Sequence, residues 1–156
     1  MADFVTVLTE DHRRVEQLLK QFDETGDPAV AQQIFLELSV HTMVEEELLY
    51  SLYFSKVDSA GVIEARADHQ EAKDLIVELE AMDPDSDEFV TTMTKLKTSV
   101  LHHVDEEERE MFPKIIEALP DTARLLGNDI VARKAVVEEQ LLAGPARMPG
   151  TSWRSP

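Results

Sequence analysis

Two segments of the sequence carry a histidine and a glutamate four residues apart, a spacing that suits a shared metal site. They are His41-x-x-x-Glu45 and His103-x-x-x-Glu107. Residues four apart lie on one face of an α-helix, so a ring nitrogen and a carboxylate oxygen of each pair can reach the same ion. Two further histidines occupy other segments, and each follows an aspartate. The candidate metal ligands are therefore His12, His41, Glu45, His69, His103 and Glu107.

All six candidates fall among apolar residues at helical spacing. His12 lies between Leu8 and Val15 on such a seam, and Glu107 continues the seam that contains Val100. A residue on an apolar seam points toward the core of a helical bundle. Burying an ionised carboxylate costs several kcal/mol unless a cation compensates it. No lysine or arginine lies on these seams, so the two glutamates predict a bound metal.

The available donor atoms restrict the choice of metal. The sequence has no cysteine, which excludes zinc–thiolate sites, iron–sulfur clusters and thiol catalysis. Histidine nitrogens combined with carboxylate oxygens suit iron, and suit manganese or zinc less well. The number of ligands, two of them carboxylates able to bridge, favours two ions. Ferritin-like bundles use Glu-x-x-His on two helices and a single glutamate on the others, so the reversed order here argues against that class.

Helices must position these residues, and the sequence contains four segments of suitable length. Breaks rich in Gly, Pro, Asp and Ser separate stretches in which apolar residues recur every three or four positions. We expect an all-α fold, an antiparallel up-down four-helix bundle occupying 1–120. A fifth, accessory helix at 121–143, starting at an Asp121-Thr122 cap, and a disordered tail at 144–156 follow. The expected bundle helices span about 3–25, 28–56, 61–82 and 86–119.

The first four segments form two copies of one helical hairpin. Asp11-His12 and Asp68-His69 stand at matching positions, with the same spacing to the apolar residues that follow. The next helix in each copy carries the His-x-x-x-Glu motif and an acidic cluster. A duplicated helical hairpin closes naturally into an antiparallel four-helix bundle.

The charge of the chain disfavours several kinds of partner. There are 32 Asp and Glu residues against 15 Lys and Arg, a formal net charge of -17, and no basic stripe. Phosphate groups are bound by clustered Lys and Arg, so we expect neither a nucleic-acid partner nor an anionic membrane surface. The N-terminus has no basic region before an apolar run, and no apolar stretch of about 18 residues occurs, so we expect a cytoplasmic protein. The sequence indicates no particular protein partner.

The ligand pattern resembles that of the hemerythrin-like, or HHE cation-binding, family. The resemblance covers about residues 3–119 and is most specific from His102 to Glu108, followed by Met111-Phe112-Pro113. It implies a non-haem di-iron centre between the four helices, with two iron ions joined by an oxo or hydroxo bridge. It also implies a small ligand such as O2, peroxide or nitric oxide.

One position departs from the oxygen-carrying hemerythrins. Those carriers have a second histidine four residues after the third-helix histidine, where this chain has Lys73. One iron is then short of a nitrogen ligand, which favours reaction with peroxide over reversible oxygen storage. A phenol from Tyr50 or Tyr53 is a candidate for the open position, and Glu110 is a candidate ligand or proton relay.

Other polar residues near the motifs have simpler explanations. His102 competes with His103 for the fourth-helix position, but helical phase turns His103 inward and leaves His102 exposed. The flanking glutamates suit solvated helix faces, although one of them could tune a ligand indirectly. They are Glu46, Glu47, Glu106 and Glu108.

Three functions remain open on this sequence. The leading one is a di-iron redox protein that binds O2 or a related ligand, with catalase-like peroxide decomposition or an oxidase reaction as its candidate activity. The alternative is a non-catalytic oxygen-sensing, redox-sensing or iron-binding module, in which the state of the metal alters the fifth helix. The third is a metal-free interaction bundle.

Overall fold

The computed structural model describes residues 3–144, and all the regular structure among them is helical. Two of the long helices are each interrupted by a π-helical turn, so each consists of three consecutive segments. The segments are α1 (Phe4–Thr25), α2 (Pro28–Val44), η1 (Glu45–Tyr50), α3 (Ser51–Lys56), α4 (Ser59–Ala81), α5 (Asp87–Glu106), η2 (Glu107–Met111), α6 (Phe112–Ala118) and α7 (Pro120–Leu142).

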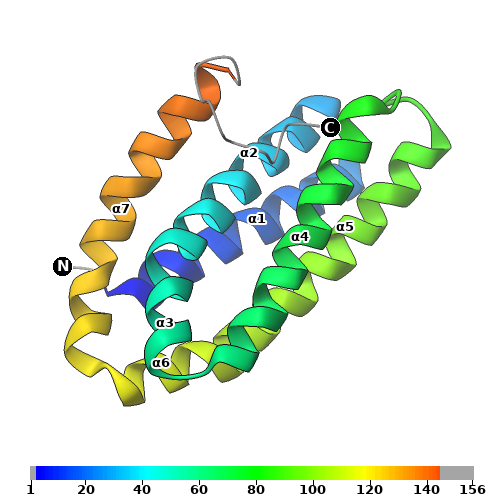
Figure 1. Cartoon of the computed structure of the whole chain (residues 1–156). Helices are drawn as coiled ribbons and strands as arrows, with labels where there is room; N and C mark the ends of the chain where they lie inside the picture. The colour runs from blue at the N-terminus through cyan, green and yellow to red at the C-terminus, as the bar shows by residue number, and fades with distance from the viewer. Residues whose placement is uncertain (1–2, 145–156) are drawn as a thin grey trace.

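Four rods form an antiparallel bundle: α1, the α2–η1–α3 rod, α4 and the α5–η2–α6 rod (Figure 1). α1 packs on α2, and α4 packs on α5, as two helical hairpins would. The predicted all-α bundle is therefore confirmed. Within residues 3–144 no helix is long and apolar enough to cross a membrane.

Side chains at the breaks between segments start the long helices. Asp3, Asp27, Asp58 and Ser86 each accept a hydrogen bond from a backbone N–H of the first turn that follows. α1 ends at Gly26, whose φ of 62° lies in the left-handed region that glycine adopts without steric cost. These caps fix where the helices begin and end, and so fix the position of each ligand candidate along the bundle axis.

Both interrupted rods change to π-helical pairing at the predicted glutamates. η1 begins at Glu45, and η2 begins at Glu107. In a π-helix the backbone hydrogen bonds join residues five apart, which widens the turn. Helical rods occupy the expected ranges 28–56 and 86–119, but a pattern of about 3.6 residues per turn does not predict the π-turn inside each of them. Turns of this kind occur often at functional sites.

The fifth helix, α7, is packed against the bundle along its length. It begins at Pro120 without a capping side chain, so the expected Asp121-Thr122 cap is wrong. It lies beside α1 and α2 on one side of the bundle (Figure 1), and its Ile130 is fully buried. The disordered tail predicted for 144–156 lies outside the described residues, apart from its first residue.

Candidate metal centre

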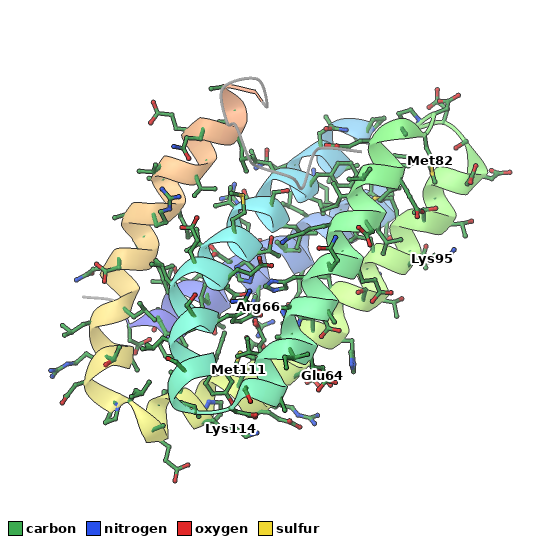
Figure 2. The ribbon with its side chains drawn as sticks, in the orientation of Figure 1. Glu64, Arg66, Met82, Lys95, Met111 and Lys114 are labelled. Atoms are coloured by element: carbon green, nitrogen blue, oxygen red, sulfur yellow. The ribbon has the colours of Figure 1, made fainter. Side chains whose placement is uncertain are left out.

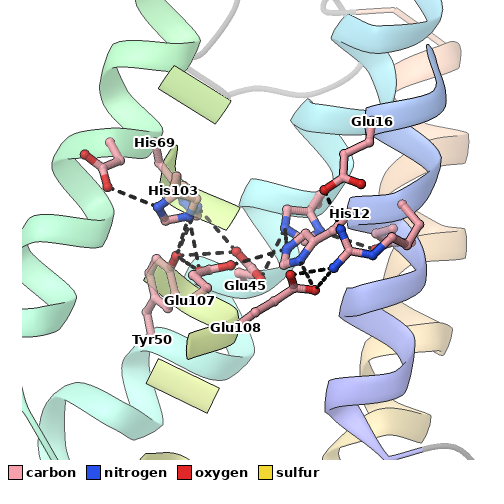
Figure 3. Close-up of polar contacts among 12 residues, drawn as sticks. His12, Glu16, Glu45, Tyr50, His69, His103, Glu107 and Glu108 are labelled. Carbon is pink, nitrogen blue, oxygen red and sulfur yellow. Dashed lines mark hydrogen bonds and ion pairs between the residues drawn. The ribbon is translucent and has the colours of Figure 1, made fainter. Parts of the chain in front are cut away.

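The six residues predicted as metal ligands lie together in the middle of the bundle, where their donor atoms form two overlapping groups (Figure 3). All six side chains are buried. Their role as ligands stays a prediction. Every rod contributes at least one of them: His12 from α1, His41 and Glu45 from α2 and η1, His69 from α4, and His103 and Glu107 from α5 and η2.

Each glutamate spans two histidines on different hairpins. The Oε1 atom of Glu45 lies 3.2 Å from His41 Nε2, and its Oε2 atom lies 3.3 Å from His69 Nε2. Glu107 repeats the arrangement: its Oε1 atom lies 3.2 Å from His103 Nε2, and its Oε2 atom lies 3.4 Å from His12 Nε2. Both carboxylates are therefore placed to bridge two neighbouring ions.

The cluster has two halves that share both glutamates. The first half contains His12 and His41, and the second half contains His69 and His103. The two Nε2 atoms are 3.2 Å apart in the first half and 2.9 Å apart in the second. Ligands about 2.1 Å from one ion are roughly 3.0 to 3.4 Å apart at octahedral or tetrahedral angles. The donor atoms of each half are therefore spaced as around one ion.

Unpaired polar atoms also indicate a cation at this place. Within residues 3–144, three buried side-chain atoms have no hydrogen-bond partner: His12 Nδ1, Glu45 Oε1 and Glu107 Oε2. Both of these glutamate oxygens face the first half, at ion-pair distance from its histidines. A buried carboxylate oxygen without a hydrogen bond is costly, and a metal ion in the first half would offset that cost.

Two of the histidines are held from outside by aspartates. His41 Nδ1 lies 3.3 Å from Asp11 Oδ2, and His103 Nδ1 lies 3.1 Å from Asp68 Oδ2. A histidine that donates through Nδ1 presents its Nε2 lone pair to the cluster, which is the form that binds a metal. These aspartates occupy matching positions in the two hairpins.

The other two histidines have glutamates, in place of aspartates, beside their Nδ1 atoms. His69 Nδ1 donates to Glu46 Oε1 at 3.0 Å, and Lys73 Nζ donates to the same oxygen at 2.8 Å. His12 Nδ1 is 3.5 Å from Glu108, without a hydrogen bond between them. Lys73 therefore lies outside the cluster and holds Glu46, and Glu46 in turn orients the ring of His69.

Charges within the cluster shift the pKa values of its members. Burial acts to lower the pKa of His41, but the charge of Glu45 and hydrogen bonds with Asp11 and Glu45 raise that pKa to about 10. Burial acts to raise the pKa of Glu107, but the charge of His103 and hydrogen bonds to histidines lower it well below its usual range. Without a metal, these pKa shifts favour a protonated His41 beside an ionised Glu107, and a bound ion would displace the proton.

Tyr50 adds a hydroxyl group to the second half. Its oxygen lies 3.0 Å from His69 Nε2 and 3.2 Å from His103 Nε2, and it donates a hydrogen bond to Glu107. The π-turn makes this contact possible, because Tyr50 stands five residues after Glu45. Burial and the charges of both glutamates raise the pKa of the phenol well above its usual value.

The matching position of the first half carries Phe112, which follows Glu107 at the same offset. The Phe112 ring stacks on His12 with centroids 5.9 Å apart, and the Tyr50 ring stacks on His69 at 5.0 Å. At this position the two halves therefore differ by a single hydroxyl group. Sequence analysis missed this pairing, although the repeated hairpin contained the signal.

The remaining candidates lie around the cluster without joining it. Burial and the charge of Asp58 raise the pKa of Tyr53 to about 12, and its hydroxyl pairs with that aspartate. Glu110 is exposed. His102 is exposed too, as helical phase predicted, and pairs with Glu106 at 3.2 Å. Within the described part of the chain, none of the three candidates forms a hydrogen bond or ion pair with the six ligand candidates.

Two cavities adjoin the cluster. One of about 30 Å³ lies against the four histidine rings, and its almost wholly apolar wall includes Val15, Leu38 and Val100. The other, of about 60 Å³, touches His103 and Glu107 from the opposite end, and both polar and apolar side chains line it. Figure 2 labels three residues of its lining, Glu64, Met111 and Lys114.

Sequence analysis missed the groups that hold the histidines from outside. Asp11 and Asp68 each precede a ligand candidate but contact His41 and His103 on neighbouring helices. Their repetition in both hairpins was the available signal. Lys134 of α7 forms an ion pair with Asp11, and no motif in the sequence indicates that contact.

Known proteins resemble this chain in sequence and fold. It is 25% identical over 122 residues to an uncharacterised hemerythrin-like protein of Schizosaccharomyces pombe, covering 74% of this chain and 60% of that protein. It is 27% identical over 140 residues to a protein of Nostoc sp. named a DNA nickase, covering 86% of this chain and 40% of that protein. The chain thus spans less than two thirds of the length of these relatives.

A crystal structure of a hemerythrin HHE cation binding domain-containing protein from Mycobacterium kansasii has the same fold. The TM-score is 0.82 at 23% identity, over 99% of this chain and 98% of that chain. The family model of the hemerythrin HHE cation binding domain matches residues 3–115, which include all six ligand candidates. This chain therefore belongs to the hemerythrin HHE cation binding domain family.

Proposed function

We propose that the protein holds two iron ions in this cluster and binds or reacts with O2 or peroxide, in a redox or oxidative-stress role. The observation that carries the proposal is the sharing of two buried glutamates between two histidine pairs, with one oxygen of each carboxylate facing each half. Shared carboxylates suit a pair of neighbouring ions. The proposed ligands are His12, His41, Glu45, His69, His103 and Glu107.

Iron suits this donor set better than the alternatives. Imidazole nitrogen and carboxylate oxygen bind first-row ions of intermediate softness, and manganese or zinc would fit less well. The unpaired buried oxygens of Glu45 and Glu107 support a cation. Bound iron would supply Lewis-acid and one-electron redox chemistry.

The two halves offer different numbers of donors. The second half has the Tyr50 hydroxyl beside His69 and His103 in addition to the shared glutamates, whereas the first half has the unsubstituted ring of Phe112 at the matching position. We place the exchangeable position in the first half, where one donor fewer leaves room for a small ligand. With iron bound, the Tyr50 hydroxyl would offer the further donor that Lys73 does not provide.

The adjoining cavities suit small ligands. A volume of about 30 Å³ exceeds the roughly 10–15 Å³ that one water molecule requires, and the apolar wall favours O2 or another diatomic molecule. The second cavity, which reaches the carboxylate of Glu107 and the exposed Lys114, is the proposed route for peroxide and water.

The alternative function, a sensing or iron-binding module without turnover, is favoured by two ion pairs of α7. α7 is tied to the neighbourhood of the cluster by ion pairs from Lys134 to Asp11 and from Arg133 to Glu47. A change of metal charge or occupancy at the cluster could reach the surface of the bundle through this helix.

Metal analysis with peroxide assays tests the proposal. Freshly purified protein should contain two equivalents of iron, and Glu45→Gln should hold less than one, with Glu47→Gln as a control at an exposed neighbour. Sustained oxygen evolution from ferrous protein and peroxide supports the enzyme, and stoichiometric oxidation alone supports the module. Protein with less than one equivalent of iron, and with no loss of stability on chelation, would refute both.

We further propose that the chain acts in the cytoplasm and does not bind nucleic acid. The net charge of -17 opposes contact with phosphates. A gel-shift experiment with plasmid DNA at low salt tests this, since the nickase relative makes DNA the relevant probe; a retarded band that disappears with added salt would contradict the proposal.

A further inference from the structure

We infer that Lys134 of α7 is a positioning residue for the first half of the cluster, acting through Asp11 on His41. The inference rests on the proposed metal function and goes beyond it, because it assigns a role to the helix that follows the four-helix bundle. That helix contributes none of the six ligand candidates.

Three side chains from three helices form a continuous chain of contacts. Lys134 Nζ pairs with Asp11 Oδ1, and the other oxygen of the same carboxylate accepts a hydrogen bond from His41 Nδ1 at 3.3 Å. A carboxylate held by a cation on one side has a defined orientation on the other. Asp11 therefore keeps the His41 ring turned with Nε2 toward Glu45, and outer partners of this kind govern metal affinity.

His103, which matches His41 in the second half, lacks this support. The carboxylate that a lysine holds in that half is Glu46, which contacts His69 instead. His103 Nδ1 donates to Asp68 at 3.1 Å, but in the described part of the chain no lysine or arginine forms an ion pair with Asp68. The Asp68 side chain is 22% exposed, against 11% for Asp11, so its carboxylate is also more accessible to solvent. α7 thus acts on one half of a cluster that is otherwise built from repeated parts.

A neighbouring contact ties α7 to η1, which carries the shared Glu45. Arg133 Nε donates to Glu47 Oε2 at 2.7 Å, and its Nη2 atom donates to Oε1 at 3.1 Å. Glu47 belongs to η1, two residues after Glu45. Consecutive residues of α7 therefore hold both α1, which carries His12 and Asp11, and η1.

Removing the Lys134 charge should leave the fold intact. Lys134 and Asp11 line a crevice of about 220 Å³ between α1, α2 and α7, so water can replace the ammonium group. Lys134→Met keeps most of the aliphatic stem, and Lys134→Arg keeps the charge. Lys97→Met is the matched control, because Lys97 forms a cross-helix ion pair with Asp23 away from the cluster.

The first measurement is the release of Fe2+ from the loaded protein into excess bipyridine, followed by absorbance. We expect one of the two equivalents to leave about tenfold faster in Lys134→Met, the lower end of the effect of outer-shell changes on metal sites. The other equivalent should keep its rate. Lys134→Arg and Lys97→Met should release both equivalents as the unaltered protein does.

The second measurement uses metal-free protein and ¹H–¹⁵N correlation spectra of the imidazole nitrogens. Lys134→Met should alter the His41 ring signals and leave those of His103 unchanged. Release at the unaltered rate in this variant, or equal acceleration of both equivalents, overturns the inference and leaves the di-iron function standing. If the unaltered protein takes up no iron, the proposed function fails, and unchanged His41 signals would then reject the positioning role as well.

Discussion

Replacing Tyr50 with phenylalanine removes one oxygen atom and gives the second half of the cluster the same aromatic ring as the first. The change leaves the ring stacked on His69, but deletes the hydrogen bond to the ionised Glu107. A hydrogen bond to a charged group contributes about 1.5–3 kcal/mol. In a chain of 156 residues each kcal/mol shifts Tm by roughly 2–4 °C, so the metal-free variant should melt about 3–12 °C lower.

The iron-loaded protein provides a second readout of the same change. A phenolate bound to ferric iron absorbs visible light, so Tyr50→Phe should lose a visible band while keeping two equivalents of iron. The reverse change, Phe112→Tyr, should add such absorption and weaken azide binding in the first half. Tyr53→Phe is the control, because the Tyr53 hydroxyl pairs with Asp58 outside the cluster.

The reasoning fails if Tyr50→Phe leaves both Tm and the visible spectrum unchanged, because the phenol would then have no energetic or electronic part in the centre. A band lost equally in Tyr53→Phe would assign the absorption to a different tyrosine. Azide binding unaffected by Phe112→Tyr would remove the assignment of the exchangeable position to the first half.

Three further predictions concern charge, ligand identity and helical phase. The pKa of His41 is raised from 6.5 to about 10 in metal-free protein. The protonated ring therefore stabilises the fold fully below about pH 6.5, and this stabilisation is lost as pH rises through 10. Thermal melts should show Tm falling over that range, and falling less when iron is bound. Glu45→Gln should lose iron by metal analysis whereas Glu47→Gln retains it, and equal iron content in the two would contradict the bridging role. His102→Ala should keep full iron content and change stability by no more than about 0.5 kcal/mol in denaturant melts, since this side chain is exposed.

Helical periodicity was sufficient to predict the positions of the six ligand candidates. His12 and His41 fall in apolar seams on α-helices, where a repeat of about 3.6 residues determines which face is buried. The same repeat predicts that His103 faces the core and His102 faces solvent, and in the structure the His103 side chain is buried and the His102 side chain is exposed.

Periodicity could not predict the contacts that depend on the π-turns or on the fifth helix. With α-helical pairing, Tyr50 would face away from Glu45, so its position beside His69 depends on the π-turn of η1. The contact of Lys134 with Asp11 joins residues far apart in the chain, and it depends on how α7 lies across α1 and α2. Surface lysines carry no periodic signal that would identify such a partner.

Each π-turn lets its rod hold one residue more than an α-helix of the same length. Tyr50 therefore stands five residues after Glu45 and still faces the histidines, although in an α-helix a fifth residue would be turned about 140° away. Deleting one residue between them would restore α-helical pairing and leave the phenol on the same face, four residues after the glutamate, and the same holds for Phe112 after Glu107. A deletion in an ordinary α-helical turn has a different effect, because everything beyond it rotates by about 100°. The two π-turns are therefore the places where these rods can lose a residue without turning the groups beyond them away from the cluster.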